Sequence, residues 1–345
     1  MTDWLDGDTI YAATGVVVPA FFSASTSEET VARLLRMTLA DLPRIVAPEN
    51  VWLVVDGDPR TAEIARRVLP GIAPELQLLP LPNNHGKLGA MREGTLALLA
   101  TRPQVRYVAF LDGDGDHMAT VVPRLVRTVA FIEGARGIED VVVIGARASR
   151  SRPMGWLRGE LEELLDQVTV DALAYALARQ GRVLDVSCFL PGQVCDISSG
   201  FKVFTRHLVA NTVAHDPGFL GTISRADYDR YGPETMTVVE AALAGALVAE
   251  AQRPTWDGQP TTAYGEYRLV AVYGELLAWV WERLDISVEG AAAMFDNRAP
   301  GRALRTTQEG LKLLAEVRAH ALTRLQAWRG EEGAISPPRA LPPFF

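Results

Sequence analysis

The chain has little cysteine and no excess of positive charge. Cys188 and Cys195 are the only cysteines among its 345 residues, too few for a disulfide framework, and no Cys/His spacing indicates zinc. A reducing, cytoplasmic location is therefore expected. The formal net charge of −8 argues against a surface that binds nucleic acid. It does not exclude a small anionic substrate, because a metal ion can offset local charge.

Long hydrophobic runs are missing as well. No stretch approaches the roughly 18–20 uncharged apolar residues that span a bilayer. The acidic start of the chain lacks the basic and apolar regions of a signal peptide. The nearest apolar run, Leu269–Trp281, is interrupted by Glu275 and is predicted to be a packed helix. Four prolines within residues 335–345 predict an extended tail. Its terminal Phe344 and Phe345 are expected either to dock on a partner subunit or to be loose.

Apolar and amphipathic segments alternate up to about residue 150. We expect buried strands at residues 16–18, 51–56, 76–81, 105–112 and 141–145, and helices at residues 27–42, 61–69, 88–100 and 121–134. The first strand is expected to end at Pro19. The strands read as continuous β-branched runs, which is typical of a parallel sheet with helices on both faces. The predicted fold class is α/β, Rossmann-like, with a mostly parallel central sheet.

Helices prevail beyond residue 150. They are expected at residues 157–178, 235–249 and 306–329, with a turn and a short strand within 196–206. We divide the chain into an α/β catalytic domain (residues 1–265), a C-terminal helical extension (266–334) and the proline-rich tail (335–345). The apolar face of the last helix is expected to pack on its own domain or on the second subunit of a homodimer; it comprises Leu311, Leu313, Leu314, Val317 and Leu322.

Polar residues follow several of the predicted strands. Asp56, Asn83, Asn84 and Asp112 all stand at such strand ends. In an open parallel sheet, ligands bind beyond the carboxyl ends of the strands. These side chains are therefore expected to converge on one crevice.

The most informative segment is an apolar strand that runs into three alternating carboxylates and a histidine, Asp112, Asp114, Asp116 and His117. Like charges this close repel and raise one another's pKa unless a cation lies among them. Carboxylate oxygens at a strand end suit Mg²⁺ or Mn²⁺, which usually bring a substrate phosphate. The alternative is an acidic turn in which Gly113 and Gly115 supply positive φ angles.

Five segments, taken in order along residues 15–265, carry a resemblance to a known family. They are Val18-Pro19-Ala20 with Ser27-Glu28-Glu29-Thr30, the run from Asn83 to Gly94, the run from Asp112 to His117, Gly145-Ala146-Arg147, and the run from Asp196 to Arg206. In this order they resemble glycosyltransferase family 2, and within it the branch of the dolichyl-phosphate mannose synthases.

The resemblance implies a GT-A fold that binds a nucleoside diphosphate sugar. Asp112, Asp114 and Asp116 would surround Mn²⁺ or Mg²⁺, which would stabilise the departing nucleoside diphosphate. Candidate donor-binding residues are Pro19, Asp56, Asn84, Lys87, Asp112, Gly113, Arg147 and Arg206. For the lysine the alternative is a solvated side chain at a helix start, and for the two arginines it is a surface ion pair.

The chain departs from the family at two places. After the second strand it reads Val55-Asp56-Gly57-Asp58, where the family usually has Asp-Asp-Gly-Ser. Asp56 is still expected to hold the base, and analogy with the mannosyl branch slightly favours GDP. The Gln-x-x-Arg-Trp motif of processive polysaccharide synthases is missing, so polymer synthesis is not expected.

Candidate catalytic residues are Glu234 and His117. In many inverting members a Glu-Asp pair begins a helix, and Pro233-Glu234-Thr235 occupies that place here. The Glu234 carboxylate would deprotonate an acceptor hydroxyl; the alternative is a helix-start acid that interacts with the dipole. A lipid-phosphate acceptor would need no base. His117 and His85 flank the phosphate region and would orient phosphate, bind metal or act as an acid, or serve only as hydrogen-bonded structural residues.

Several functions fit these residues. The first is a soluble, metal-dependent, inverting glycosyltransferase that uses a nucleoside diphosphate sugar and a small-molecule or lipid-phosphate acceptor. The second is a nucleotide-sugar mutase, for example a pyranose–furanose mutase. A nucleotidyltransferase would usually carry a glycine-rich phosphate loop, which residues 16–30 lack. A non-catalytic nucleotide-sugar-binding protein would not need the intact acidic cluster.

Overall fold

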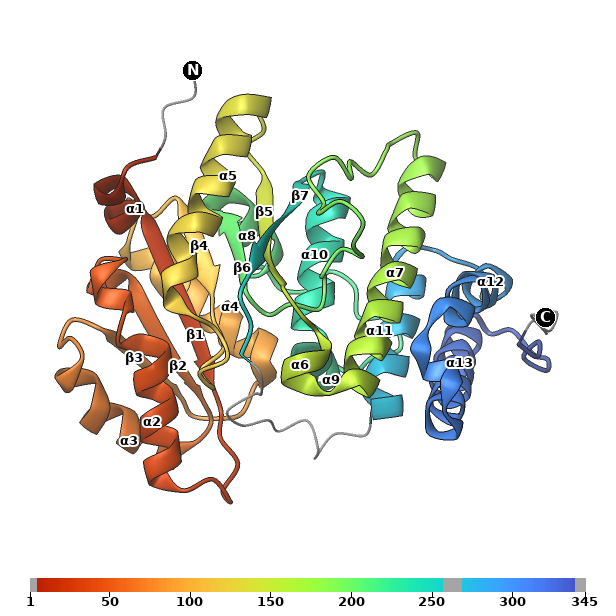
Figure 1. The fold of residues 1–345 in the computed structure, drawn as a ribbon, viewed down its shortest axis with the longest axis horizontal. Coiled ribbons are helices and arrows are strands. Elements are labelled where there is room, and N and C mark those ends of the chain that lie inside the picture. Colours follow the sequence, from red (N-terminus) through yellow and green to blue (C-terminus); the bar gives the residue numbers. More distant parts are fainter. Residues whose placement is uncertain (1–4, 257–268, 339–345) are drawn as a thin grey trace.

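The computed structural model describes residues 5–256 and 269–338, and their seven strands form one sheet (Figure 1). The strands are β1 (Thr14–Ala20), β2 (Val51–Asp56), β3 (Gln77–Leu81), β4 (Tyr107–Phe110), β5 (Val141–Arg147), β6 (Lys202–Thr205) and β7 (Leu247–Arg253). Their order is β3-β2-β1-β4-β6-β5-β7. Only β6 runs antiparallel to its neighbours, β4 and β5. The predicted mostly parallel α/β sheet is confirmed.

Strands β1 and β5 are mostly apolar because both faces of the sheet are covered there. Every residue of β1 and of β5 is buried. Successive side chains alternate between two cores: Val17 lies in one, while Val16 and Val18 lie in the other. A continuous apolar run is therefore what a strand in this sheet requires.

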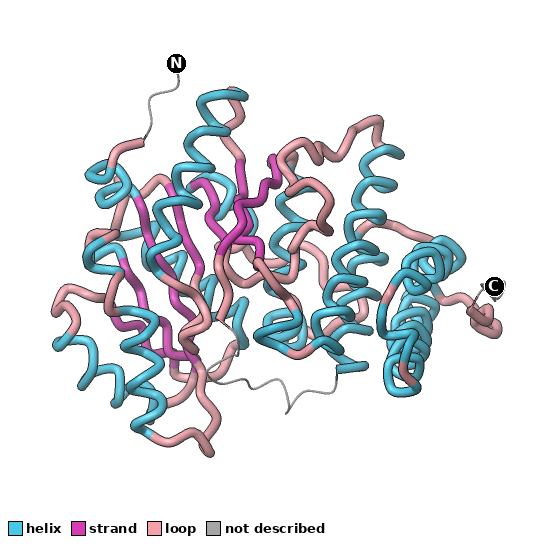
Figure 2. The backbone as a smooth tube through the Cα atoms, in the orientation of Figure 1, coloured by secondary structure: helices cyan, strands magenta, loops and turns pink. Residues whose placement is uncertain are grey.

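Helices flank the sheet on both sides (Figure 2). They are α1 (Gly7–Ala13), α2 (Glu28–Leu39), α3 (Pro59–Val68), α4 (Gly86–Thr101), α5 (Val122–Arg136), α6 (Ser151–Met154), α7 (Trp156–Arg179), α8 (Arg206–Thr212), α9 (Arg225–Tyr231), α10 (Pro233–Ala244), α11 (Leu269–Arg283), α12 (Val288–Arg298) and α13 (Gln308–Arg329). Helix α2 begins directly after its N-cap residue Ser27, because the Ser27 hydroxyl accepts the Thr30 backbone N–H at 3.2 Å.

Several predicted boundaries are shifted by a few residues, and two of the differences are informative. Strand β1 does not end at Pro19 but continues to Ala20, and the proline pairs in register with Val54 of β2. The helix predicted over residues 235–249 ends at Ala244, because Gly245 adopts a left-handed conformation (φ 95°) that terminates it. The chain then forms β7, a strand that the apolar run after Gly245 did not reveal, because it reads equally well as helix.

The C-terminal extension packs against the domain that precedes it. The predicted helix at residues 269–281 is confirmed as α11, which contacts both α7 and α13. The apolar face of α13 is buried within the same chain at Leu313, Leu314, Val317 and Leu322, while Leu311 is exposed. Across the described ranges, no helix combines the length and apolar character needed to cross a bilayer. Phe344 and Phe345 lie outside the described residues.

Candidate active site

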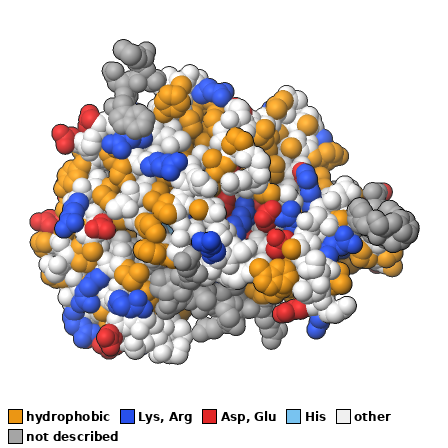
Figure 3. All heavy atoms as spheres, viewed as in Figure 1, with side chains coloured by type: hydrophobic (Ala, Val, Ile, Leu, Met, Phe, Trp, Pro, Cys, Tyr) orange, Lys and Arg blue, Asp and Glu red, His pale blue; other side chains and the backbone are white. Residues whose placement is uncertain are grey.

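A cavity of about 470 Å³ opens at the carboxyl ends of the parallel strands, between the sheet and helices α7, α10 and α11. Acidic and basic side chains gather in the central hollow of the face shown in Figure 3. The strand-end wall, as we call it, consists of Pro19, Ala20, Phe21, Phe22, Asp56, Asn84, Gly86, Lys87, Ala90, Asp112, Gly113, Asp114, Asp116 and His117. The helical wall consists of Met154, Arg158, Glu162, Arg230, Tyr231, Pro233, Glu234, Thr235, Val272, Tyr273 and Leu276. Further lining residues are Arg147, Ser198, Gly200 and Arg253.

The acidic loop, residues 112–117, is held in place from three sides. Gly115 has a φ of 82° and donates its N–H to the Thr38 hydroxyl at 3.1 Å. Its carbonyl accepts the Trp256 indole N–H at 3.1 Å. The Gly113 N–H donates to the Pro19 carbonyl at 3.2 Å, which ties the loop to the end of β1. The loop is thus a built feature of the cavity, although Gly115 does serve the turn geometry that the alternative interpretation proposed.

His117, the last residue of this loop, holds the loop in place from within. The residue is 2% exposed, and its ring stacks on Phe201 with 5.0 Å between ring centroids. Nδ1 accepts the Asp112 backbone N–H at 2.9 Å, and Nε2 lies 4.0 Å from Asp112 Oδ2. Burial, followed by the nearby positive charges of Arg253 and Lys87, lowers the pKa of His117 well below its ordinary value. A neutral imidazole that positions Asp112 fits these contacts better than an acid catalyst.

The carboxylates of the acidic loop carry excess negative charge. Burial and the neighbouring charges of Asp112 and Asp116 raise the pKa of Asp114 to about 7. A divalent cation would relieve this repulsion, and oxygen ligands of this kind suit Mg²⁺ or Mn²⁺. Within residues 5–256 and 269–338, however, no group of three or more Asp, Glu, His or Cys side chains is arranged to hold a metal. In this arrangement the three carboxylates do not form a ready-made three-ligand site, and the predicted metal binding stays a prediction.

Two of the three carboxylates already contact other groups of the protein, and this partly explains why the three do not form one ligand set. Asp112 Oδ1 is directed to the Lys87 ammonium at 2.6 Å, and Asp114 Oδ1 accepts the Asp116 backbone N–H at 3.1 Å. Mg²⁺ commonly keeps several waters and takes only one or two protein carboxylates together with substrate phosphates. The donor set thus fits a cation that shares its ligands with a diphosphate.

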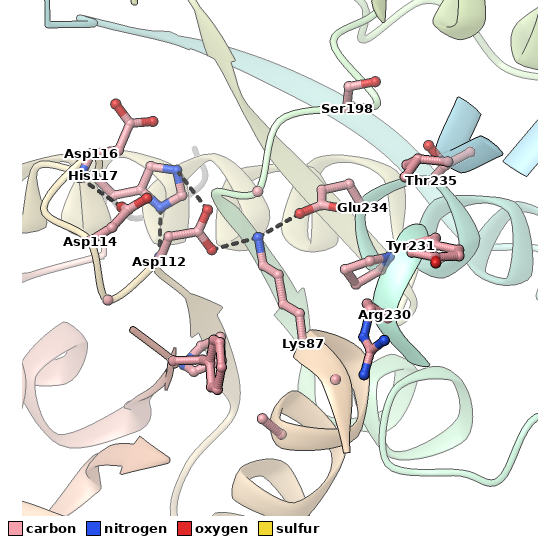
Figure 4. Close-up of a pocket in the computed structure, with 18 of the residues that line it drawn as sticks. Lys87, Asp112, Asp114, Asp116, His117, Ser198, Arg230, Tyr231, Glu234 and Thr235 are labelled. Carbon is pink, nitrogen blue, oxygen red and sulfur yellow. Dashed lines mark hydrogen bonds and ion pairs between the residues drawn. The ribbon is translucent and has the colours of Figure 1, made fainter. Parts of the chain in front are cut away.

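Lys87 bridges the two walls of the cavity (Figure 4). Its Nζ lies 2.6 Å from Asp112 Oδ1 and 2.5 Å from Glu234 Oε1, near the start of α10. Burial disfavours the ammonium charge, but Asp112 and Glu234 outweigh that effect and raise the pKa of Lys87 above its ordinary value. Gly200 makes this approach feasible, because a Cβ there would lie 2.8 Å from Asp112 Oδ2 and 3.1 Å from Lys87 Nζ.

Asp56 and Asn84 meet at the far end of the strand-end wall. Asp56 is 3% exposed, and its Oδ1 accepts the His85 backbone N–H at 2.7 Å. Burial raises the pKa of Asp56 above its ordinary value. The Asn84 amide donates to the Asp56 carbonyl at 3.3 Å. Both residues line the cavity, whereas the exposed His85 acts through its backbone and is not among the lining residues described.

Residues 15–152 match glycosyl transferase family 2. The matched region spans β1 to β5 and includes the acidic loop, which supports a glycosyltransferase. Among solved structures, the chain is similar to one described as the crystal structure of S. aureus TarS 1-349, with 12% identity, a TM-score of 0.40 and coverage of 92% of this chain and 91% of that chain. No curated protein matches the chain. The mannose-synthase-like branch stays a prediction.

Two arginines that the resemblance to family 2 suggested as phosphate ligands are engaged elsewhere. Arg147 lines the cavity, but its guanidinium is buried and binds Asp196 at 2.6 Å and Glu162 at 2.9 Å. Arg206 lies outside the cavity and donates to the carbonyls of Arg102, Val105 and Leu99 at 2.8–3.0 Å. Because β6 is antiparallel, its carboxyl end lies at the opposite edge of the sheet, so the prediction for Arg206 is wrong.

Most of the helical wall was missed from the sequence. Glu162 of α7 accepts from Arg158 at 2.9 Å and from the Tyr273 hydroxyl at 3.0 Å, so α7 and α11 are joined at the cavity. The i, i+4 spacing of Arg158 and Glu162 on a predicted helix was a visible signal, but nothing indicated which face of the helix met the cavity. Arg253, at the end of β7, could not be placed because that strand was not predicted. The family 2 match ends before all of these residues.

Proposed function

We propose that the protein is a metal-dependent glycosyltransferase that takes a nucleoside diphosphate sugar as donor and inverts the configuration of the transferred sugar. The observation that carries this proposal is the Lys87 bridge. Because Lys87 Nζ contacts Asp112 at 2.6 Å and Glu234 at 2.5 Å, the acidic loop and the candidate base lie one side chain apart in one cavity. Inverting transfer needs these two functions on opposite sides of a reacting carbon.

The donor would lie along the strand-end wall. Asp56 and Asn84 offer a carboxylate and an amide to the base, while Pro19 and Gly113 supply backbone surface between the base and the acidic loop. Lys87 would contact the diphosphate. Mg²⁺ or Mn²⁺ held by carboxylates among Asp112, Asp114 and Asp116 would add positive charge where the leaving group gains negative charge. Analogy with the mannosyl branch makes GDP the first nucleotide to test.

The acceptor would lie on the helical wall, next to Glu234. In the reaction, Glu234 takes the proton of an acceptor hydroxyl as its oxygen bonds to the anomeric carbon. The bond from that carbon to the diphosphate breaks, and the electron pair leaves with the phosphate oxygen. The hydroxyls of Tyr231, Thr235 and Tyr273 line this side, together with the apolar Val272 and Leu276. Such a mixture suits a small hydroxyl-bearing acceptor.

A nucleotide screen tests the proposal. Thermal shifts are measured for nucleoside diphosphates with and without Mn²⁺, and the protein is then incubated with the corresponding nucleotide sugars and a panel of small hydroxyl acceptors. Metal-dependent stabilisation by one nucleotide is expected, since a ligand that binds only the folded state raises its stability. Acceptor-dependent release of free nucleoside diphosphate supports transfer. A changed sugar ring on an intact nucleotide indicates a mutase, and no stabilisation by any nucleotide contradicts the proposal.

A further inference from the structure

We propose that Lys87 couples the two halves of the displacement: it is one shared cation through which proton uptake by Glu234 and charge build-up on the leaving diphosphate assist each other. This inference rests on the proposed function and extends it. The geometry behind it is the pair of contacts from Lys87 Nζ, 2.6 Å to Asp112 and 2.5 Å to Glu234. The contact with Glu234 joins residues that are 147 positions apart in the chain.

The buried cations that line the cavity, Arg147 and Arg253, have fixed partners of their own. Arg147 binds Asp196 in a two-pronged contact, with a further bond to Glu162. Arg253 donates to the Gly145 carbonyl at 3.0 Å. Lys87, by contrast, contacts the acidic loop on one side and the candidate base on the other. Its ammonium is therefore placed to interact with a bound diphosphate and with Glu234 at the same time.

The immediate surroundings keep Lys87 in this shared position. Gly200 has no side chain to separate the ammonium from Asp112. The turn that presents Gly200 is held by the buried Lys202, whose ammonium donates to the carbonyls of Ile197, at 3.0 Å, and Ser199. Lys87 is the second residue of α4 and directly follows Gly86, whose φ of 80° sets the direction in which the chain enters the helix. The bridge thus depends on four separate segments that meet at one point: the start of α4, the acidic loop, the turn at Gly200 and the start of α10.

The coupling follows from the charge changes in the reaction. Before transfer, Glu234 is an anion and attracts the ammonium. When Glu234 accepts the acceptor's proton it becomes neutral, and at the same time the departing phosphate oxygen gains an electron pair. The attraction felt by Lys87 therefore shifts from the carboxylate to the phosphate as the bond breaks, without movement of another cation. Substituting either Lys87 or Glu234 should therefore remove the rate enhancement that the other provides.

A double-mutant cycle tests this prediction. Lys87→Met, Glu234→Gln and the double variant are compared by kcat at saturating donor and hydroxyl acceptor. Each single variant is expected to lose about a hundredfold or more. The double variant should lie within about tenfold of the slower single variant, because residues that act as a unit are strongly non-additive. Losses that multiply, to about ten-thousandfold, would overturn the inference.

Binding gives a second readout that does not depend on turnover. In EDTA, Glu234→Gln is expected to tighten binding of the cognate nucleoside diphosphate several-fold, because the Lys87 ammonium is no longer paired with a carboxylate at position 234. This gain should vanish in the Lys87→Met background, since coupling between two groups is reciprocal. A gain that persists without Lys87, or no gain in its presence, contradicts the shared-cation role.

Lys87→Arg is the conservative variant. It keeps the positive charge and is expected to retain activity within about tenfold of wild type, while thermal unfolding shows that each variant is folded. An arginine variant as inactive as Lys87→Met would count against a charge-sharing role. The two proposals fail differently: if the wild type transfers no sugar, the proposed function fails, whereas an active wild type with multiplicative losses refutes only the coupling.

Discussion

The two walls of the cavity differ in how their charges are balanced. On the helical wall, buried charges are matched at close range: Glu162 accepts from both Arg147 and Arg158 at 2.9 Å. On the strand-end wall, three carboxylates share a short loop, and the pKa of Asp114 is raised to about 7 by burial and by its acidic neighbours. The first wall is balanced by its own side chains, while under the proposed function the second would be balanced by a bound cation.

This difference suggests a division of labour. A wall whose charges are already neutralised offers shape and hydrogen bonds, and so it discriminates between acceptors. A wall with excess negative charge would attract a cation, and under the proposed function it would serve the diphosphate and its departure. Lys87 is the point where the two meet, and changes on either wall should therefore have different kinetic signatures.

The strand-end wall should be the more sensitive of the two. Asp114→Asn is expected to slow nucleoside diphosphate release by about a thousandfold, since loss of metal-assisted stabilisation costs several kcal/mol. Release is measured with saturating Mn²⁺ and donor. Asp41→Asn is the matched control, because Asp41 is exposed and lies 3.8 Å from Arg44 on the surface. Equal activities of the two variants would remove Asp114 from the reaction.

Glu234→Gln changes the helical wall next to the bridge. We expect kcat with a hydroxyl acceptor to fall by about 100- to 10,000-fold, as for loss of a general base, while donor binding is not weakened. Glu309, an acid in the first turn of α13, provides the control for a purely dipolar role. If Glu309→Gln and Glu234→Gln lower the melting temperature alike and leave kcat unchanged, the base assignment is wrong.

Gly200→Ala tests the contact between the walls. The added Cβ would lie 2.8 Å from Asp112 Oδ2 and must displace it or Lys87. A decrease in kcat of about ten- to a hundredfold is expected, because small misplacements of reacting groups are costly. Gly71→Ala, where a Cβ meets nothing within 4 Å, should be silent. An active Gly200→Ala would show that the bridge tolerates displacement.

The pH dependence of stability should report the charge imbalance of the strand-end wall. An aspartate carboxyl ordinarily has a pKa of 3.8, whereas the pKa of Asp114 in the folded protein is about 7. Between these values the folded state holds a proton that the unfolded state has lost, so the free energy of unfolding falls as pH rises from about 4 to about 7. Chemical denaturation across this window measures the slope. Asp114→Asn should reduce it, and an unchanged slope would contradict the raised pKa.

Tyr273→Phe should give the smallest effect. It removes the hydroxyl that donates to Glu162 at 3.0 Å, a loss of about 1 kcal/mol, and should raise the acceptor KM roughly fivefold with the donor KM unchanged. Tyr175→Phe, on the exposed surface of α7, is the control. A change confined to the donor KM would reverse the roles we give to the two walls.

The strand-end wall could be predicted from the sequence because the sheet topology determines where its residues lie. Asp56, Asn84 and Asp112 each follow a parallel strand, and such strand ends meet at one edge of the sheet. Arg206 was suggested by the family resemblance instead, and it lies at the other edge because it follows the antiparallel β6. The direction of β6, which its short apolar sequence does not reveal, determined whether Arg206 could be a phosphate ligand or only a structural contact.

The helical wall was harder to predict for a different reason. The face that α7 turns to the cavity depends on its packing against α11, which begins more than 100 residues after Glu162. Local periodicity identifies the helices but not their partners. Strand β7 was missed because its residues favour helix and strand alike until the sheet pairs them with β5.

The hydrogen bond between Trp256 and Gly115 gives this protein a natural optical probe. The indole is 40% exposed and lies one hydrogen bond from the loop that carries Asp114 and Asp116. Its fluorescence should therefore change when ions or nucleotides bind beside that loop. Comparing wild type with Trp256→Phe would isolate this signal from the other six tryptophans of the chain, so that occupancy of the strand-end wall can be followed in real time without a label.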